Sequence, residues 1–158
     1  MTALSDLFRL LFGLLSISGD AAPPADTGPG SVSREAVVLV DRQTIIFLEN
    51  GREANLSLVS TGRAGFDTPT GEFHVLYRSW APISSTYHVR MPFWLCITPG
   101  GQIGLHQTFR TGTNHLGTKQ SHGCVRMGFD TAQWSYDWLS VGSPVHIRAA
   151  SPVPAVTD

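Results

Sequence analysis

A thiol, an imidazole, a guanidinium and a hydroxyl lie within residues 121–127, which read Ser-His-Gly-Cys-Val-Arg-Met. Cysteine attacks as the thiolate, and a neighbouring imidazole or cation favours that form. Gly123 permits a backbone conformation that aims the N–H groups of Gly123 and Cys124 at one point. Such donors can stabilise a tetrahedral oxyanion by roughly 3–4 kcal/mol each. We therefore take Cys124 as a candidate nucleophile.

A cysteine nucleophile needs a base, and the chain has six histidines. His122 lies two residues before Cys124, whereas His106 lies 18 residues before it, at the end of an expected strand. A strand end holds a base more rigidly than a loop does. From the residues alone, both remain candidates. The other four are weaker: His74, His88, His115 and His146.

Arg126 and Ser121 complete the reactive stretch. Arg126 can favour the thiolate or bind a substrate carboxylate with two parallel hydrogen bonds, and it can equally be a structural clamp on the loop. Ser121 can hydrogen-bond a histidine or shape the turn. A zinc site built from His106, His115, His122 and Cys124 is disfavoured, because their spacing lacks the paired ligands of common zinc sites.

The composition indicates a single globular domain. The chain has 158 residues, of which 42% are hydrophobic and 15% are charged. A formal net charge of -1 gives no sign of a nucleic-acid partner. Sixteen glycines and ten prolines indicate many turns, which favours a mainly β fold.

The N-terminal residues have a targeting pattern. An apolar run of about a dozen residues is short of the roughly 20 that span a bilayer, and small residues follow it. We expect 1–22 to be a signal peptide or an N-terminal anchor, although an amphipathic helix packed on the domain would have a similar pattern. Residues 23–33 have linker composition, 34–149 form the expected catalytic domain, and 150–158 form an expected disordered tail.

Apolar and β-branched runs separated by turn residues predict a series of strands. Asn50-Gly51 is a strong hairpin signal between two of these runs. The expected strands are 36–40, 44–49, 55–59, 72–77, 93–98, 103–106 and 145–148. Residues 78–90 are predicted to be irregular, as a binding loop or lid whose aromatic residues, Tyr87 among them, line a cleft or cap the core.

Strand alternation and one short helix add further expectations. In 93–98, Trp94 and Cys96 should share one face, opposite Phe93, Leu95 and Ile97, and Cys96 should be a packed residue. After the reactive stretch, Asp130 can cap a helix with Gln133 at the capping-box spacing. Trp134 and Trp138 lie one turn apart on that helix, and Gly142 is expected to close it.

These residues together resemble the L,D-transpeptidase catalytic domain family. The resemblance rests on Ser121-His122-Gly123-Cys124-Val125-Arg126-Met127 preceded by His106 at a strand end. It extends to three further segments and spans residues 36–147. These segments are Ser60-Thr61-Gly62, Thr68-Pro69-Thr70-Gly71 and Met91-Pro92-Phe93-Trp94.

The resemblance implies a sandwich-like, mainly β domain with one short C-terminal helix, which cross-links peptidoglycan. Cys124 would attack the third residue of a tetrapeptide stem, D-alanine would leave, and a thioester would form. An amine from a second stem, a lipoprotein lysine or a D-amino acid would resolve it. We therefore expect an exported monomer of the periplasm or cell envelope that needs no cofactor and is acylated by carbapenems.

The resemblance also implies site roles. His106 would be the base, oriented by a nearby backbone carbonyl, with Gln107 as a candidate for orienting it; many family members have glycine at that position. Gly123, His122, Ser121 and Arg126 would shape the site, and Trp94 and Tyr87 are candidate substrate contacts. Two alternatives remain: an L,D-carboxypeptidase with the same Cys-His chemistry, and a non-catalytic wall-binding module.

Overall fold

The computed structural model describes residues 32–108 and 115–150. The expected signal or anchor segment lies outside the described residues, as do most of the expected linker and tail. Within the described ranges, no helix is long and apolar enough to cross a membrane.

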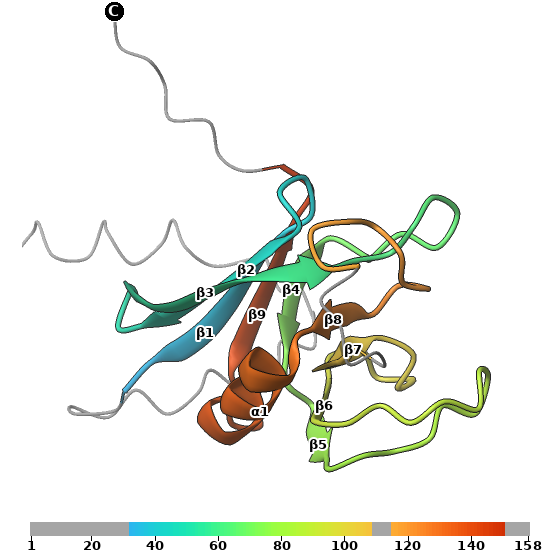
Figure 1. Ribbon diagram of the computed structural model, residues 1–158. Coiled ribbons are helices and arrows are strands. Elements are labelled where there is room, and N and C mark those ends of the chain that lie inside the picture. The colour runs from blue at the N-terminus through green and yellow to red at the C-terminus, as the bar shows by residue number, and fades with distance from the viewer. Residues whose placement is uncertain (1–31, 109–114, 151–158) are drawn as a thin grey trace, which may run out of the picture.

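The described residues form nine strands and one helix, a mainly β fold as the sequence predicts (Figure 1). The elements are β1 Arg34–Leu39, β2 Thr44–Glu49, β3 Arg52–Ser60, β4 Gly71–His74, β5 Tyr77–Ser79, β6 Trp94–Cys96, β7 Gly104–Gln107, β8 Val125–Met127, α1 Phe129–Trp138 and β9 Pro144–Arg148. The strands hydrogen-bond in the order β4-β9-β1-β2-β3-β8-β7-β6-β5.

Strand β3 joins two parts of this sheet. It pairs with β2 along its length and with β8 only at its C-terminal end, through Val59 and Ser60. Figure 1 shows β3 between the β4-β9-β1-β2 group and the β8-β7-β6-β5 group. Both groups contribute to one hydrophobic core, for example Phe47 from the first and Leu105 from the second. The sheet therefore folds over a common core, as expected for a sandwich-like domain.

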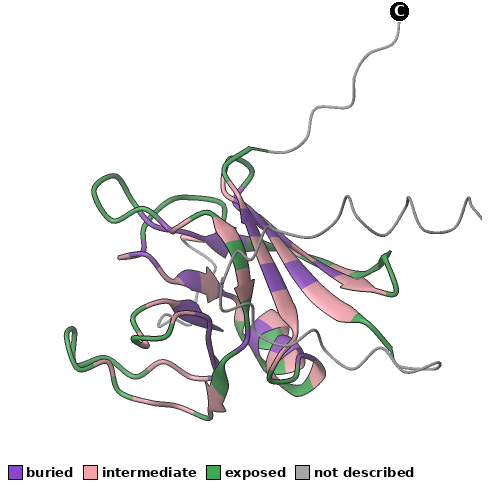
Figure 2. Cartoon of the chain, turned by 180° about the vertical axis from the view of Figure 1, so that it is seen from behind, coloured by how far each residue is buried: buried purple, intermediate pink, exposed green. Residues whose placement is uncertain are grey.

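Strand alternation places the apolar residues in that core. Along β1, Ala36 and Val38 are fully buried, whereas Glu35 and Val37 are partly exposed; Figure 2 shows such alternation for several strands. Helix α1 covers the core with two tryptophans. Trp134 and Trp138 meet the ring of Phe47 edge-on at 5.1 and 6.0 Å, which confirms the predicted apolar stripe.

The run predicted as one strand, 72–77, is divided between the two groups. Residues of β4 pair with β9, whereas β5 pairs with β6. Between them, the Val75 N–H donates to Ser143 and the Leu76 N–H donates to Cys96. The chain therefore crosses from one part of the sheet to the other at a buried valine, which a continuous apolar run does not reveal.

The helix limits differ from the predicted caps. Gly128 is the N-cap and makes no side-chain hydrogen bond there, and Asp130 lies inside the first turn. A carboxylate in that turn still interacts favourably with the helix dipole. The helix ends at Trp138 with Leu139 as C-cap, so Gly142 does not close it. With φ of +91°, Gly142 forms the turn before β9 instead.

Candidate active site

The register of the central strands gathers the reactive residues on one face. In the parallel pair β7 and β8, Leu105 lies opposite Val125, and His106 lies opposite Arg126. Leu105 and Val125 are fully buried in the core. Because successive side chains alternate between faces, His106 and Arg126 project from the other face, together with Cys124 directly before β8.

The His106 ring is held by a backbone carbonyl. Its Nδ1 lies 2.7 Å from the carbonyl oxygen of Gln107, and the residue is only 4% exposed. A carbonyl oxygen can only accept, so Nδ1 carries the hydrogen and Nε2 keeps its lone pair. Gln107 thus orients the ring through its main chain, which a residue of any type at this position can do.

Burial makes both reactive groups neutral at rest. It lowers the pKa of His106 to about 4, against the opposing effect of the Gln107 carbonyl and with a further lowering by Arg126. Burial also raises the pKa of the Cys124 thiol, although the Gly104 N–H and Arg126 act in the opposite direction. At neutral pH the pair is therefore a thiol and a neutral imidazole, and a neutral imidazole can act as a general base toward a thiol.

The side chain of Trp94 packs near the ring of His106. Its ring lies 5.8 Å from the His106 ring, and the residue is 1% exposed. A Cβ on the neighbouring Gly104 would lie 2.7 Å from the indole, so a larger residue there would displace it. The role of Trp94 as a substrate contact stays a prediction; in the structure its side chain is buried and packs near His106.

The loop before Cys124 is cross-linked by Ser121. The fully buried hydroxyl donates to the Cys124 carbonyl at 2.5 Å and accepts the Gly123 N–H at 3.1 Å. This uses the Gly123 N–H, so the Cys124 N–H remains the candidate oxyanion donor. Gly123 itself has φ of +116°, and a Cβ there would lie 2.6 Å from Ile103, so only glycine fits.

Two buried side chains that were not candidate site residues, Thr68 and Gln43, hold this loop in place through hydrogen bonds. The Thr68 hydroxyl donates to the Gly123 carbonyl at 2.7 Å and accepts the Gly62 N–H at 2.8 Å. Gln43 donates to the Thr61 hydroxyl at 2.6 Å and accepts the Thr61 N–H at 2.9 Å. The Thr61 carbonyl in turn accepts two N–H groups, those of Gln120 and Ser121.

His122 lies among aromatic side chains. Tyr87 stacks on it at 4.5 Å and 28°, and Phe66 meets it edge-on at 4.8 Å. Burial, followed by the charges of Arg63 and Arg126, lowers the pKa of His122. Tyr87 lies in the segment that follows β5, so this segment reaches the reactive stretch. The range predicted to be irregular, 78–90, includes Arg78 and Ser79, which belong to β5. The arrangement leaves His106 as the better-oriented base.

The family comparison agrees with this geometry. A family model described as L,D-transpeptidase catalytic domain (YkuD) matches residues 33–147. The chain belongs to this family. The curated relative L,D-transpeptidase 1 of Mycobacterium tuberculosis is 23% identical over 124 residues, which cover 70% of this chain and 49% of the relative. The chain thus spans about half the length of the curated relatives it matches.

Solved L,D-transpeptidases have the same fold. The structure from Mycobacterium smegmatis is 25% identical, with a TM-score of 0.68, over 75% of this chain and 59% of that one. The structure from Stackebrandtia nassauensis is 26% identical, with a TM-score of 0.67, over 76% and 57%. A third, solved in complex with imipenem, is 23% identical with a TM-score of 0.67, over 74% and 59%.

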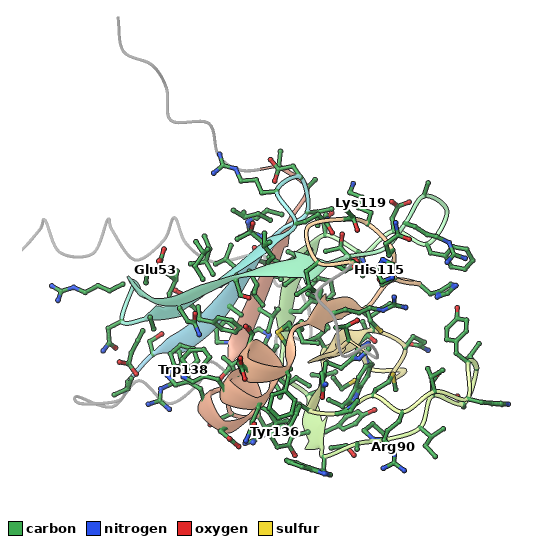
Figure 3. All side chains as sticks on the ribbon, in the orientation of Figure 1. Glu53, Arg90, His115, Lys119, Tyr136 and Trp138 are labelled. Carbon is green, nitrogen blue, oxygen red and sulfur yellow. The ribbon has the colours of Figure 1, made fainter. Side chains whose placement is uncertain are left out.

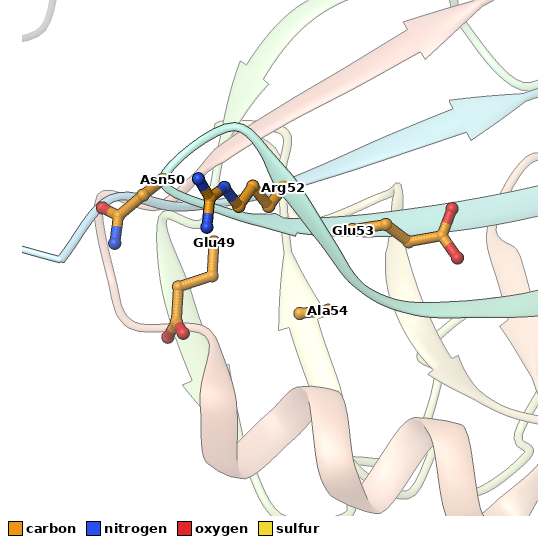
Figure 4. A pocket seen from close by; sticks show the side chains of 5 residues that line it. All are labelled: Glu49, Asn50, Arg52, Glu53 and Ala54. Carbon is orange, nitrogen blue, oxygen red and sulfur yellow. The ribbon is translucent and has the colours of Figure 1, made fainter.

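A surface hollow lies away from this candidate site. It is an open depression at the β2–β3 hairpin, lined by Glu49, Asn50, Arg52, Glu53 and Ala54 (Figure 4). Figure 3 shows Glu53 on one side of the molecule, and the loops that carry Arg90, His115 and Lys119 on the other. The hollow contains no nucleophile, so the chemistry places the candidate site at Cys124. Among the described residues, no group of His, Cys, Asp or Glu is arranged to hold a metal ion.

Replacing Gln43 with alanine should slow acylation of Cys124 about tenfold. Gln43 is 4% exposed and holds Thr61, whose carbonyl positions Ser121. Losing the amide leaves the Thr61 N–H unpaired, at a cost of about 1–3 kcal/mol in unfolding free energy. Small displacements of a nucleophile have large kinetic costs. The measurement is the rate of carbapenem acylation by intact mass, alongside thermal unfolding.

Val145→Ala is the matched control for this prediction. Val145 is fully buried in β9, on the part of the sheet that does not carry Cys124. It should lose comparable stability and keep the parental acylation rate. If both variants slow acylation equally, Gln43 acts only through general stability.

Proposed function

We propose that this protein is a cysteine L,D-transpeptidase that transfers an acyl group of a peptidoglycan stem peptide to an amine. The observation that supports it most is the pairing of β7 with β8. This pairing places His106 opposite Arg126, and Cys124 directly precedes β8. There the Gln107 carbonyl leaves His106 Nε2 unprotonated. Family membership and the common fold support the same activity.

The acylation half of the reaction uses these two residues. Neutral His106 removes the proton from Cys124 as the sulfur attacks the carbonyl carbon of the third stem residue. The oxyanion accepts a hydrogen bond from a backbone N–H. When the intermediate collapses, the amide C–N bond breaks and the His106 imidazolium gives its proton to the departing amine. The products are a thioester on Cys124 and free D-alanine.

In the second half of the reaction, the acyl group passes from Cys124 to an acceptor, and Cys124 is the leaving group. An acceptor amine loses a proton to His106 and attacks the thioester carbon, the C–S bond breaks, and the Cys124 sulfur takes the proton back. The acceptor is an amine of a second stem, a lipoprotein lysine or a D-amino acid, and water would make the enzyme a carboxypeptidase. This activity belongs in the periplasm or cell envelope, where it would contribute to wall organisation and cell shape.

Mass spectrometry of the products separates these outcomes. The protein is incubated with a stem tetrapeptide, with and without an added D-amino acid. We expect loss of D-alanine and a product that carries the acceptor. Tripeptide as the sole product would favour the carboxypeptidase, and tight binding to sacculi without any turnover would favour a wall-binding module.

A further inference from the structure

Two arginines flank the reactive loop from different strands. Arg126 lies two residues after Cys124, a spacing of roughly 7 Å along an extended chain. Arg63 follows Gly62, which forms a parallel bridge with Ser121, and the Arg63 N–H donates to the Ser121 carbonyl at 3.0 Å. The main chains of both residues are therefore fixed next to Cys124 and the loop before it.

The Arg63 side chain is held in place by rings. Its guanidinium lies over the Phe66 ring at 4.6 Å, and Phe66 in turn meets His122 at 4.8 Å. A guanidinium on an aromatic face keeps its N–H edge free for hydrogen bonding. Arg126 makes one long hydrogen bond among the described residues, from Nη1 to the Gln120 carbonyl at 3.4 Å. Both arginines thus keep donors for a ligand.

Both arginines contact the 120–121 segment, and neither has a carboxylate partner among the described residues. Burial lowers the pKa of Arg126; Cys124 acts in the opposite direction, and the charge of Arg63 lowers the pKa as well. The ion pairs of the described ranges use Arg34, His146 and Arg148 instead. Asp67 is close in sequence to Arg63, yet it pairs with neither arginine. Like charges held together in this way favour binding of an anion.

We propose that Arg63 and Arg126 bind a free carboxylate of the donor peptide and make the protein selective for donors that carry it. This inference rests on the proposed function. A residue that leaves through its amine has its own carboxylate about 3–4 Å from the attacked carbonyl carbon, by standard bond lengths. A carboxylate at this distance from the attacked carbon is within range of an arginine two residues from Cys124. A side-chain carboxylate of the third stem residue is the second source of the same chemistry.

Binding to a Cys124→Ala background tests the proposal without consuming the peptide. Three tetrapeptides are titrated by calorimetry: one with all carboxylates free, one with a C-terminal carboxamide, and one with the third residue's side-chain carboxyl amidated. We expect the C-terminal carboxamide to weaken binding about tenfold, equivalent to about 1.4 kcal/mol. If the side-chain amide has this effect instead, the carboxylate comes from the third residue and the paired-arginine site stands.

Variants of Arg63 test whether the two arginines cause the preference for a free carboxylate. Arg63→Gln should reduce the tenfold preference to less than threefold, and Arg63→Lys should restore part of it. Arg52→Gln, an equal change of charge at the exposed β2–β3 hairpin, should leave the preference intact. The proposal is overturned if no amidation weakens binding, if no peptide binds, or if Arg63→Gln keeps the full preference.

Turnover by the unsubstituted protein distinguishes failure of the carboxylate site from failure of the proposed transpeptidase function. If it transfers acyl groups from free and amidated donors equally well, the carboxylate site is wrong and the transpeptidase function stands. If it transfers none, the proposed function itself fails.

Discussion

Replacing Cys124 with alanine should abolish acyl transfer and covalent labelling by a carbapenem completely. The alanine variant has no sulfur to form the thioester, and no other side chain on the shared face of β7 and β8 is a nucleophile of comparable strength. Intact-mass measurement gives the result directly. The unsubstituted protein should gain the mass of one carbapenem, and Cys124→Ala should gain none.

The second cysteine provides the control. Cys96 is fully buried, and its sulfur lies 3.2 Å from the Thr98 carbonyl, as expected for a packed thiol. Cys96→Ala should therefore label to the same extent as the unsubstituted protein. If Cys124→Ala still takes up one carbapenem, the nucleophile has been misassigned, and labelling lost in Cys96→Ala would identify the other thiol.

Replacing His106 with alanine should lower the rate of acylation by about 10²–10⁴-fold, the usual contribution of a positioned general base. The Cys124 thiol is neutral at pH 7 because burial raises its pKa. Without His106, no oriented group takes the proton as the sulfur attacks. The measurement is the pseudo-first-order rate of carbapenem acylation. His122→Asn is the comparison, and a larger loss there would make His122 the base.

The pH dependence of that rate gives an independent test of the same assignment. With a pKa of about 4, His106 is neutral and able to accept a proton throughout pH 5–8. The unsubstituted protein should therefore show a nearly flat profile over this range, and a fall in rate as His106 becomes protonated near pH 4. His106→Ala should instead accelerate with rising pH, because only the thiolate then reacts. A fall centred near pH 6.5 would contradict a buried base.

The reactive residues could be recognised from the sequence because their types are unusual together. A cysteine preceded by glycine and histidine, with arginine two residues later, has few structural explanations. The parallel register of β7 and β8 then places His106, 18 residues before Cys124 in sequence, opposite Arg126. The Gln107 carbonyl orients the His106 ring, whereas the His122 ring stacks on Tyr87. Sequence spacing alone leaves both histidines open, because it does not give strand pairing.

The residues that hold the site were not predicted, since their chemistry is ordinary. Gln43 lies between two expected strands, 36–40 and 44–49, and Thr68 lies in one of the segments that resemble the family, but neither was a candidate site residue. Each is buried and makes hydrogen bonds to residues remote in sequence: Gln43 makes two to Thr61, and Thr68 makes one to Gly123. Hydrogen bonds of this kind form only where two loops lie side by side. The order of the strands in the sheet decides which loops do so, and no local sequence pattern reveals it.

By itself, the sequence determined the chemistry and most of the strands, because both depend on residue type and on short-range periodicity. It specified Cys124, a choice of two bases, and a packed Cys96. Only the tertiary structure decided that the Gln107 carbonyl orients the His106 ring, that the Trp94 ring packs near it, and that the Gly123 N–H donates to Ser121. These outcomes follow from pairing between distant strands, which fixes the face on which each side chain projects.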